Sequence, residues 1–370
     1  MTNVLITGGL GFIGSHTVDV LRERGFNVSI YDNCEKQVHG KTLPEYYDSK
    51  IEFIKGDIRH KRHLEKALEG KEVVIHLASM TGSSQSLWQP SKYVSANITG
   101  TANLFEAIIL NSKIKRRMQK IVMASSSYIY GEGTYNCELH GTVNPPVRTV
   151  DQLKSKEWEI SCPFCHKPVT PVGTKETKPF QMANVYSLSK YASEVIGERY
   201  AAIIGIPVVS FRYFNVYGPR QSLINPYTGV ISVFISRLKS GRKPIIFEDG
   251  LPSRDFVYVK DVAMLNYLAI HKGEGVINLG SGKRTSIIDI FRNVKNSMGT
   301  DIEPEISQEG RIGDIRHIYS DNSKLIKYFG SPYFTGITEG INDTVSWSIL
   351  NKSKDYFSKV ERLRKRYTNW

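Results

Sequence analysis

The chain has 370 residues, of which 40% are hydrophobic and 23% are charged. This balance excludes disorder as the main state, and the length favours one large domain with a smaller partner. No stretch approaches the ~18 consecutive apolar residues of a membrane helix, and the N-terminus lacks the pattern of a secretory signal. We therefore expect a soluble, cytoplasmic protein.

Lysine and arginine exceed aspartate and glutamate by 49 to 36, which gives a net charge of +13. Such a charge favours anionic partners such as nucleic acid, acidic membranes or phosphorylated small molecules. The excess gathers in two clusters: Lys113, Lys115, Arg116, Arg117 and Lys120, and then Lys352, Lys354, Lys359, Arg362, Arg364, Lys365 and Arg366. Because no nucleic-acid-binding motif accompanies either cluster, we interpret them as solvated surface and a charged C-terminal helix. We expect neither a nucleic-acid nor a membrane partner.

Short β-branched runs alternate with helical patterns in the first half of the chain. Strands are predicted at residues 4–6, 27–31, 51–54, 73–77 and 121–123, and the first helix at residues 13–24. This alternation is typical of βαβ units, so we predict an α/β fold with a parallel sheet. After Phe214 the pattern becomes irregular and rich in Gly and Pro, which indicates a smaller α+β cap.

We predict four regions. They are a cofactor-binding domain (1–133, 183–213 and 253–284), a Pro- and Cys-bearing insertion (134–182), a substrate-binding domain (214–252 and 285–345) and a basic tail (346–370).

The strongest local motif is a glycine-rich turn between the first predicted strand and helix. Gly8, Gly11 and Gly14 follow the spacing G-x-x-G-x-x-G. Glycine lets a backbone approach a pyrophosphate closely, and a helix N-terminus favours phosphate. Asp32 ends the second predicted strand, where a carboxylate accepts hydrogen bonds from adenosine ribose and repels a 2′-phosphate. We therefore predict NAD rather than NADP, although Lys36 lies nearby.

A candidate catalytic pair opens a later predicted helix, at residues 186–204. Tyr186 and Lys190 are four residues apart and so share a helix face. A tyrosine with its ordinary pKa of ~10 is a poor base at neutral pH. A neighbouring ammonium, together with a positive nicotinamide ring, favours the phenolate and lowers that pKa. The serine run 125–127 ends another predicted strand, where parallel sheets place ligands.

Taken together and in order, these motifs resemble a known family. The glycine spacing, Asp32, Asp57 after a third strand, a serine run leading to Tyr130-Gly131, and Tyr-x-x-x-Lys are followed by segments 211–219, 254–257 and 311–314. This order resembles the extended short-chain dehydrogenase/reductases, specifically the nucleotide-sugar epimerases and dehydratases. The resemblance covers most of residues 1–330 outside the insertion. It implies a Rossmann fold, a doubly wound parallel sheet with helices on both faces, that binds NAD and a nucleotide-diphosphate sugar.

The resemblance also implies roles for individual residues. Tyr186 would be the general base for the sugar C4 hydroxyl, Lys190 would hold the nicotinamide ribose, and Ser126 would hydrogen-bond the reacting oxygen. The expected cofactor-binding residues are Gly8, Gly11, Phe12, Ile13, Gly14, Asp32, Asn33, Asp57, Ile58, Leu77, Ala78, Asn97, Tyr186 and Lys190. The expected substrate-binding residues are Ser126, Ser127, Asn215, Phe247, Arg254, Arg311 and Asp314.

The two residues after Ser126 discriminate between reactions. Dehydratases of this family carry Asp-Glu there, and UDP-glucuronate decarboxylases carry a Glu at the second position, whereas this chain has Ser127 and Tyr128. Elimination needs an acid and a base, so their absence here favours 4-epimerisation through a transient 4-keto sugar. A UDP-hexose or UDP-hexuronate 4-epimerase, a 4,6-dehydratase, a decarboxylase and a catalytically silent NAD-binding regulator stay open as alternatives.

The insertion carries a possible structural zinc site. Cys137 and His140, then Cys162 and Cys165, form C-x-x-H and C-x-x-C pairs spaced for one tetrahedral ion. Free thiols in a loop are the alternative, and His166 is a spare candidate ligand. The insertion and segments 216–221 and 225–230 resemble those of dTDP-L-rhamnose 4-epimerases. The family also implies a homodimer, with residues 92–111 and 186–204 pairing into a four-helix bundle.

Overall fold

The computed structural model describes residues 1–225, 227–311 and 313–367. Position 226 of the segment 225–230, position 312 of the segment 311–314, and residues 368–370 of the predicted tail lie outside the described residues.

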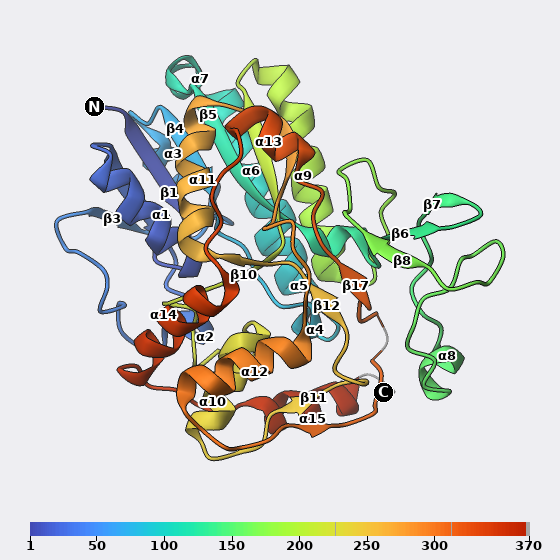
Figure 1. The fold of residues 1–370 in the computed structure, drawn as a ribbon. Coiled ribbons are helices and arrows are strands. Elements are labelled where there is room, and N and C mark those ends of the chain that lie inside the picture. The colour runs from blue at the N-terminus through green and yellow to red at the C-terminus, as the bar shows by residue number, and fades with distance from the viewer. Residues whose placement is uncertain (226, 312, 368–370) are drawn as a thin grey trace.

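A parallel sheet organises the larger part of the molecule (Figure 1). Within the described residues it has seven strands, and every neighbouring pair is parallel. Their order across the sheet is β14 (Gly275–Leu279), β9 (Val208–Tyr213), β5 (Lys120–Ser126), β4 (Val73–His76), β1 (Asn3–Thr7), β2 (Asn27–Asp32) and β3 (Glu52–Lys55). The chain reverses its direction of winding between β1 and β4, and such a switch point opens a crevice at the carboxyl edge of a sheet.

Helices cover both faces of this sheet, because its strands bury side chains on both sides. Val4 and Ile6 of β1 point into one core, and Leu5 points into the other. The first core is closed by α1 (Phe12–Glu23), α11 (Val259–His271) and α13 (Ser323–Phe329). The second is closed by α3 (Lys61–Leu68), α6 (Gly100–Leu110), α7 (Ser112–Arg117) and α9 (Val185–Ile204). The predicted Rossmann fold is thereby confirmed.

The helix predicted at residues 92–111 is continuous but irregular. It begins as α5 (Pro90–Tyr93), passes through a π-helical turn, η1 (Val94–Thr99), and continues as α6. Such π-helical turns are rare and gather at functional sites. Three short helices complete this part: α2 (Lys36–His39), α4 (Ser83–Ser86) and the 3-10 turn η2 (Ser127–Tyr130).

A smaller α+β body lies below the carboxyl edge of the sheet (Figure 1). Its core is built by α10 (Val230–Lys239), α12 (Ile287–Met298) and α14 (Ile337–Ile349). Short strands connect it to the sheet: β10 (Asn215–Tyr217) pairs with β13 (Phe256–Tyr258), β11 (Ile245–Ile246) with β16 (Glu305–Ile306), and β12 (Ser253–Arg254) with β15 (Thr285–Ser286) and β17 (His317–Ile318). The helix α15 (Phe357–Tyr367) packs against this body.

The insertion projects to one side as a small lobe (Figure 1). Its strands β7 (Gly141–Val143), β6 (Thr134–Cys137) and β8 (Thr170–Val172) form an antiparallel sheet, and α8 (Val150–Lys154) follows β7. The buried residues of its core are Tyr135, Cys137, Val143, Ile160 and Cys162. This core is far smaller than the two that flank the main sheet.

Of the described helices, none combines the length and the apolar character that crossing a membrane requires.

Two buried histidines make the fold sensitive to acid. His76 ends β4 between the hydroxyls of Thr7 and Thr101, and burial lowers its pKa to about 3. His16 in α1 faces the Pro219 carbonyl, and burial lowers its pKa to about 4. Both rings stay neutral in the folded chain while the unfolded chain binds protons below pH ~6.5. The stability they contribute is therefore present above that pH and is lost as the pH falls.

We expect a loss of about 2 kcal/mol per ring between pH 7 and pH 5. Urea unfolding at the two pH values measures it. His76→Gln should reduce the difference, whereas His63→Asn, an exposed control in α3, should not. An equal loss in all three proteins would contradict this explanation.

Candidate active site

A cavity of about 1030 Å³ runs along the carboxyl edge of the sheet and continues into the smaller body. It is lined by nearly all the residues predicted to bind the cofactor and the substrate, namely Gly8, Gly11, Phe12, Ile13, Gly14, Asp32, Asn33, Asp57, Ile58, Leu77, Ala78, Ser126, Tyr186, Lys190, Asn215, Phe247, Arg254, Arg311 and Asp314. Segments far apart in the sequence therefore meet in one continuous site.

The glycine turn brings backbone to the floor of this cavity. Gly8 has a φ of +73°, and a Cβ there would lie 2.8 Å from the Ala78 nitrogen. A Cβ on Gly14 would lie 2.1 Å from the Gly8 carbonyl oxygen. Only glycine fits such contacts, and the turn leads directly into the N-terminus of α1, where phosphate binds well. The local geometry fits a dinucleotide pyrophosphate.

Two carboxylates lie at one end of the cavity. Asp32 at the end of β2 accepts hydrogen bonds from the backbone N–H groups of Leu10 and Cys34, while burial raises its pKa. Asp57 is held by Arg59, whose hydrogen bonds lower the pKa of the carboxyl, and it also accepts one from Asn33 at 3.0 Å. This end can therefore present acceptors to ribose and adenine groups, as NAD requires.

Asn97 and Ser127 differ from the other predicted residues, because neither is among the described residues that line the cavity. Asn97 lies in the π-helical turn, where its side chain bonds both backbone groups of Met80 and the Ser189 hydroxyl. Asn97 therefore holds the loop after β4 through Met80, which itself lines the cavity. Ser127 is buried where η2 begins.

The predicted catalytic residues lie together. An asparagine cap and a capping box at Asn184 start α9, so Tyr186 and Lys190 occupy its first two turns. Lys190 is buried, and its Nζ donates to the Ser79 hydroxyl at 3.1 Å and to the Ala124 carbonyl at 2.9 Å. Ser126 ends β5 beside them and hydrogen-bonds the Tyr186 phenol.

Burial shifts the pKa values of this pair in opposite directions. Burial raises the pKa of Tyr186 to about 12, a rise that the Ser126 hydrogen bond partly offsets. Burial also lowers the pKa of Lys190 to about 8. The prediction of a lowered tyrosine pKa applies with a positive nicotinamide ring beside the phenol, and it stays a prediction. In the chain by itself, the cost of removing the phenolate from water is the largest influence on the Tyr186 pKa.

On the substrate side, an arginine stacks on an aromatic ring. The Arg311 guanidinium lies 4.0 Å from the centre of the Phe247 ring, and its Nε donates to the Asp314 carboxylate at 2.7 Å. Arg254 donates to the carbonyls of Ser253 and Arg316. Asn215 opens β10, paired with Phe256. Guanidinium groups suit diphosphate, and a flat ring suits a nucleobase.

Sequence reasoning missed two parts of the site. Arg59 contributes a charge at the adenine end, and its place two residues after Asp57 was an available signal. The tail was interpreted as solvated, yet Tyr356, Phe357, Val360 and Glu361 line the cavity. Phe357 packs on the Phe247 ring with centroids 6.3 Å apart. Because the tail as a whole is rich in charged residues, its composition gives no sign of this apolar contact.

The four predicted metal ligands also lie together. Their ligand atoms are all within 4.8 Å of one another, in the insertion, and none of the four is among the described residues that line the cavity. A metal held there would be separate from the chemistry of the cavity.

The chain is similar to known proteins along most of its length. The family model of GDP-mannose 4,6 dehydratase matches residues 5–139, and that of the NAD dependent epimerase/dehydratase family matches residues 161–280. The chain is 32% identical over 351 residues to dTDP-L-rhamnose 4-epimerase of Burkholderia thailandensis, which covers 93% of this chain and 94% of that protein.

Two solved structures are similar over nearly their whole length. One is UDP-N-acetylglucosamine 4-epimerase from Methanobrevibacter ruminantium in complex with UDP-N-acetylmuramic acid, with a TM-score of 0.75, 33% identity and coverage of 94% of this chain and 98% of that one. The other is UDP-glucose 4-epimerase of Thermus thermophilus in complex with NAD, with a TM-score of 0.71, 28% identity and coverage of 95% and 100%.

Proposed function

Because this chain belongs to the NAD-dependent epimerase/dehydratase family of nucleotide-sugar enzymes, we propose that it inverts C4 of a nucleotide-diphosphate sugar, with dTDP-L-rhamnose as the first candidate substrate. The insertion and the relative from Burkholderia thailandensis support the dTDP-sugar. The similarity to UDP-sugar epimerases makes UDP-hexoses and UDP-hexuronates the second candidates.

One observation favours epimerisation over elimination. The rings that meet Tyr186 edge-on belong to Tyr93 and Tyr128, with centroids 6.2 and 5.8 Å away. Tyr128 occupies the position after Ser127 at which dehydratases and decarboxylases carry a carboxylate. Phenol and hydroxyl groups here supply no acid–base pair for removing water across C5–C6. A site of this kind can take the proton of the C4 hydroxyl, but it has no further base to remove the proton from C5.

The residues of the chain then have defined tasks. Tyr186 takes the proton from the C4 hydroxyl, and Ser126 donates a hydrogen bond to the reacting oxygen. Lys190 holds the nicotinamide ribose and keeps a positive charge near the phenol. When bound, NAD⁺ supplies the hydride acceptor at C4 and a further positive charge that favours the phenolate.

The remaining residues would bind the two nucleotides. The glycine turn and α1 would hold the NAD pyrophosphate, with Asp32 and Asp57 at its adenosine end. On the substrate side, Phe247 would stack on the base, and Arg254 and Arg311 would pair with the diphosphate. Asn215 and Asp314 line the same part of the cavity and would complete the substrate contacts, whereas the buried Ser127 would only support them.

The proposal is tested by incubating the holoenzyme with dTDP-, UDP- and GDP-sugars in D₂O and following C4 by NMR. A 4-epimerase removes and returns the same hydride, so the inverted product should keep protium at C4. Loss of water or CO₂ from the sugar would instead identify a dehydratase or a decarboxylase. No turnover of any sugar by NAD-loaded protein would favour a silent regulator.

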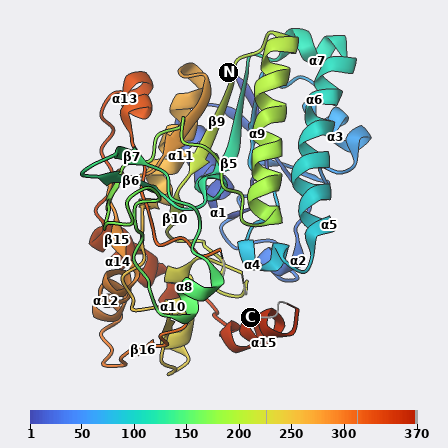
Figure 2. The same ribbon diagram turned by 90° about the vertical axis from the view of Figure 1, so that its right-hand side faces the viewer.

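We also propose a homodimer in the cytoplasm. The helices α6 and α9 lie side by side on one flank of the molecule (Figure 2). Leu188 and Ile203 of α9 are 46% and 64% exposed, and Leu110 of α6 is 69% exposed, so this flank offers apolar surface to a second copy. Light scattering at micromolar concentration should give twice the chain mass. A single-chain mass at that concentration would contradict the dimer.

The residues that line the cavity support a separate function for each region. We propose that residues 1–133, 183–213 and 253–284 bind NAD, that 214–252 and 285–345 bind the sugar nucleotide, and that residues 346–370, in their described part, add a wall to the substrate side.

A further inference from the structure

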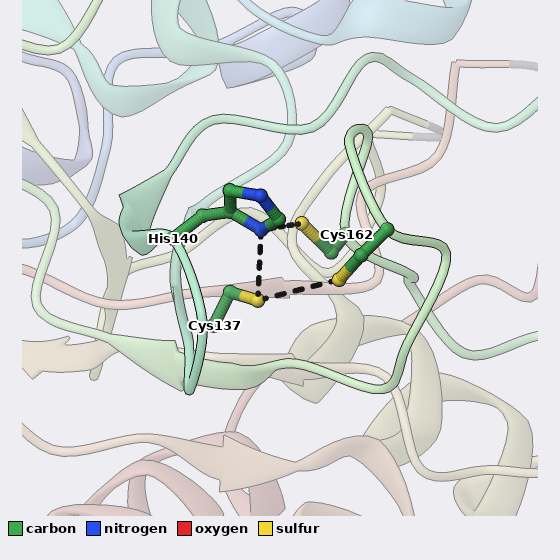
Figure 3. A group of neighbouring side chains, drawn as sticks. Cys137, His140 and Cys162 are labelled. Atoms are coloured by element: carbon green, nitrogen blue, oxygen red, sulfur yellow. Dashed lines mark hydrogen bonds between the residues drawn. The ribbon is translucent and has the colours of Figure 1, made fainter.

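Four potential metal ligands converge in the insertion from two turns (Figure 3). Cys137 ends β6, and His140 precedes β7 in the hairpin between them. Cys162 and Cys165 belong to a second tight turn, closed by the bond from the Cys162 N–H to the Lys167 carbonyl at 2.9 Å. Figure 3 shows the side chains of both turns pointing toward one another.

Three of the distances between ligand atoms match the edges of a coordination tetrahedron, and all of the ligand atoms lie within 4.8 Å of one another. The Cys137 Sγ lies 3.6 Å from the His140 Nδ1 and 3.7 Å from the Cys165 Sγ, and the Cys162 Sγ lies 3.5 Å from the same nitrogen. Tetrahedral zinc, with bonds of ~2.3 Å to sulfur and ~2.0–2.1 Å to nitrogen, places two sulfurs about 3.8 Å apart and a sulfur and a nitrogen about 3.5 Å apart. A disulfide needs ~2.05 Å between its sulfurs, so Cys137 and Cys165 are not bridged.

The donor set indicates both the metal and its role. Three cysteine sulfurs and one imidazole nitrogen are the ligands of a structural zinc site, and soft thiolates disfavour Mg²⁺ or Ca²⁺. Four protein ligands complete a tetrahedron and leave no open position for a substrate. Cys137 and Cys162 are moreover 2% and 0% exposed. The arrangement is a closed one, built for holding chain segments together.

The lobe that contains these ligands has a small hydrophobic core, so a bound metal would add stability that the core does not supply. Its core consists of five buried residues, and two of these are the ligands Cys137 and Cys162. A core of this size supplies little stability, and small domains compensate with a metal or with disulfides. The metal would tie the hairpin of β6 and β7 to the turn at 162–165.

We propose that Cys137, His140, Cys162 and Cys165 bind one structural Zn²⁺ ion, with release of the thiol protons, and that this ion holds the insertion in its folded form. This inference goes beyond the proposed epimerase activity, and it stands or falls independently of the sugar that the enzyme uses.

The lobe also reaches the substrate side of the cavity. Glu159, three residues before Cys162, accepts a hydrogen bond from the Nε of Arg316 at 3.1 Å. Arg316 in turn pairs with Glu248 and Asp249, next to Phe247 in the cavity wall. Zinc would therefore stabilise a lobe on which part of the nucleotide wall rests.

Metal analysis by mass spectrometry tests the site on full-length protein purified without a histidine tag or a chelator. We expect about one zinc per chain. His140→Asn and Cys162→Ser should lose most of it. The matched changes His166→Asn, at an exposed residue of the same turn, and Cys34→Ser, outside the insertion, should retain it.

Limited proteolysis supplies a second readout that requires no enzymatic activity. Removing zinc with a chelator should speed cleavage within residues 138–168 by about tenfold, and added Zn²⁺ should reverse the effect. Metal-free wild-type protein whose insertion resists protease as well as the zinc-loaded protein does would overturn the proposal. So would iron in place of zinc. Failure of all sugars to react, with zinc present, would overturn only the proposed function.

Discussion

Replacing Tyr186 by phenylalanine should lower kcat for epimerisation by about 10²- to 10⁴-fold and leave NAD bound. The change removes the one oxygen proposed to take the C4 proton and preserves the ring. The edge-on contacts of that ring with Tyr93 and Tyr128 therefore persist. Turnover is followed by NMR of the C4-inverted sugar, and NAD content is measured by absorbance after the protein is denatured.

The matched control is Tyr200→Phe on the same helix, α9. Its ring packs against Phe105 with centroids 5.5 Å apart, beside the second core, and Tyr200 is not among the described residues that line the cavity. This variant should keep wild-type turnover, because the same oxygen is lost where no substrate reaches. If Tyr186→Phe keeps turnover within about threefold of wild type, the proton must be taken by another group.

The cofactor half of the site was predictable because its signals are local. The alternation of strands and helices, the glycine turn and Asp32 each occupy a few adjacent residues, and the parallel sheet brings their ends to one edge. The family and the fold class that these motifs indicated are confirmed. The tyrosine and lysine of α9 lie in the cavity for the same reason.

What escaped prediction depends on contacts between distant segments. Asn97 lies in a π-helical turn and bonds the Met80 backbone, and neither the turn nor these bonds was predicted. Phe357, near the end of the chain, packs against Phe247, and the local spacing of hydrophobic residues does not predict this contact. The raised pKa of Tyr186 depends on burial, which a sequence does not state.

A buried ion-pair network joins the insertion to the substrate wall, and it too was invisible in the sequence. Arg148 of the insertion donates two hydrogen bonds to the Glu248 carboxylate, at 2.9 and 2.7 Å, across 100 residues of chain. Both side chains are 1% exposed. The same carboxylate accepts a bond from Arg316, and Arg148 also donates to the Asp314 carbonyl at 3.1 Å. Glu248 follows Phe247, so this network fixes the floor beneath the proposed nucleotide site.

Arg148→Met should therefore destabilise the protein by about 3–5 kcal/mol, since it leaves a buried carboxylate with one of its two cationic partners. Urea unfolding measures this loss. Arg22→Met is the matched control: Arg22 pairs with Asp48 at the surface, where both side chains are about 40% exposed, and its loss should cost at most about 1 kcal/mol.

Nucleotide binding separates a local role of Arg148 from general instability. At a temperature where the Arg148→Met variant is still folded, we expect its KM for the sugar nucleotide to rise about tenfold while kcat changes little. The wall that carries Phe247 and Asp314 would lose its support, whereas Tyr186 and Lys190 lie on α9 and keep theirs. Equal losses of kcat and affinity would mean that the network supports the whole cavity. Unchanged stability would mean that Arg316 alone satisfies the Glu248 carboxylate.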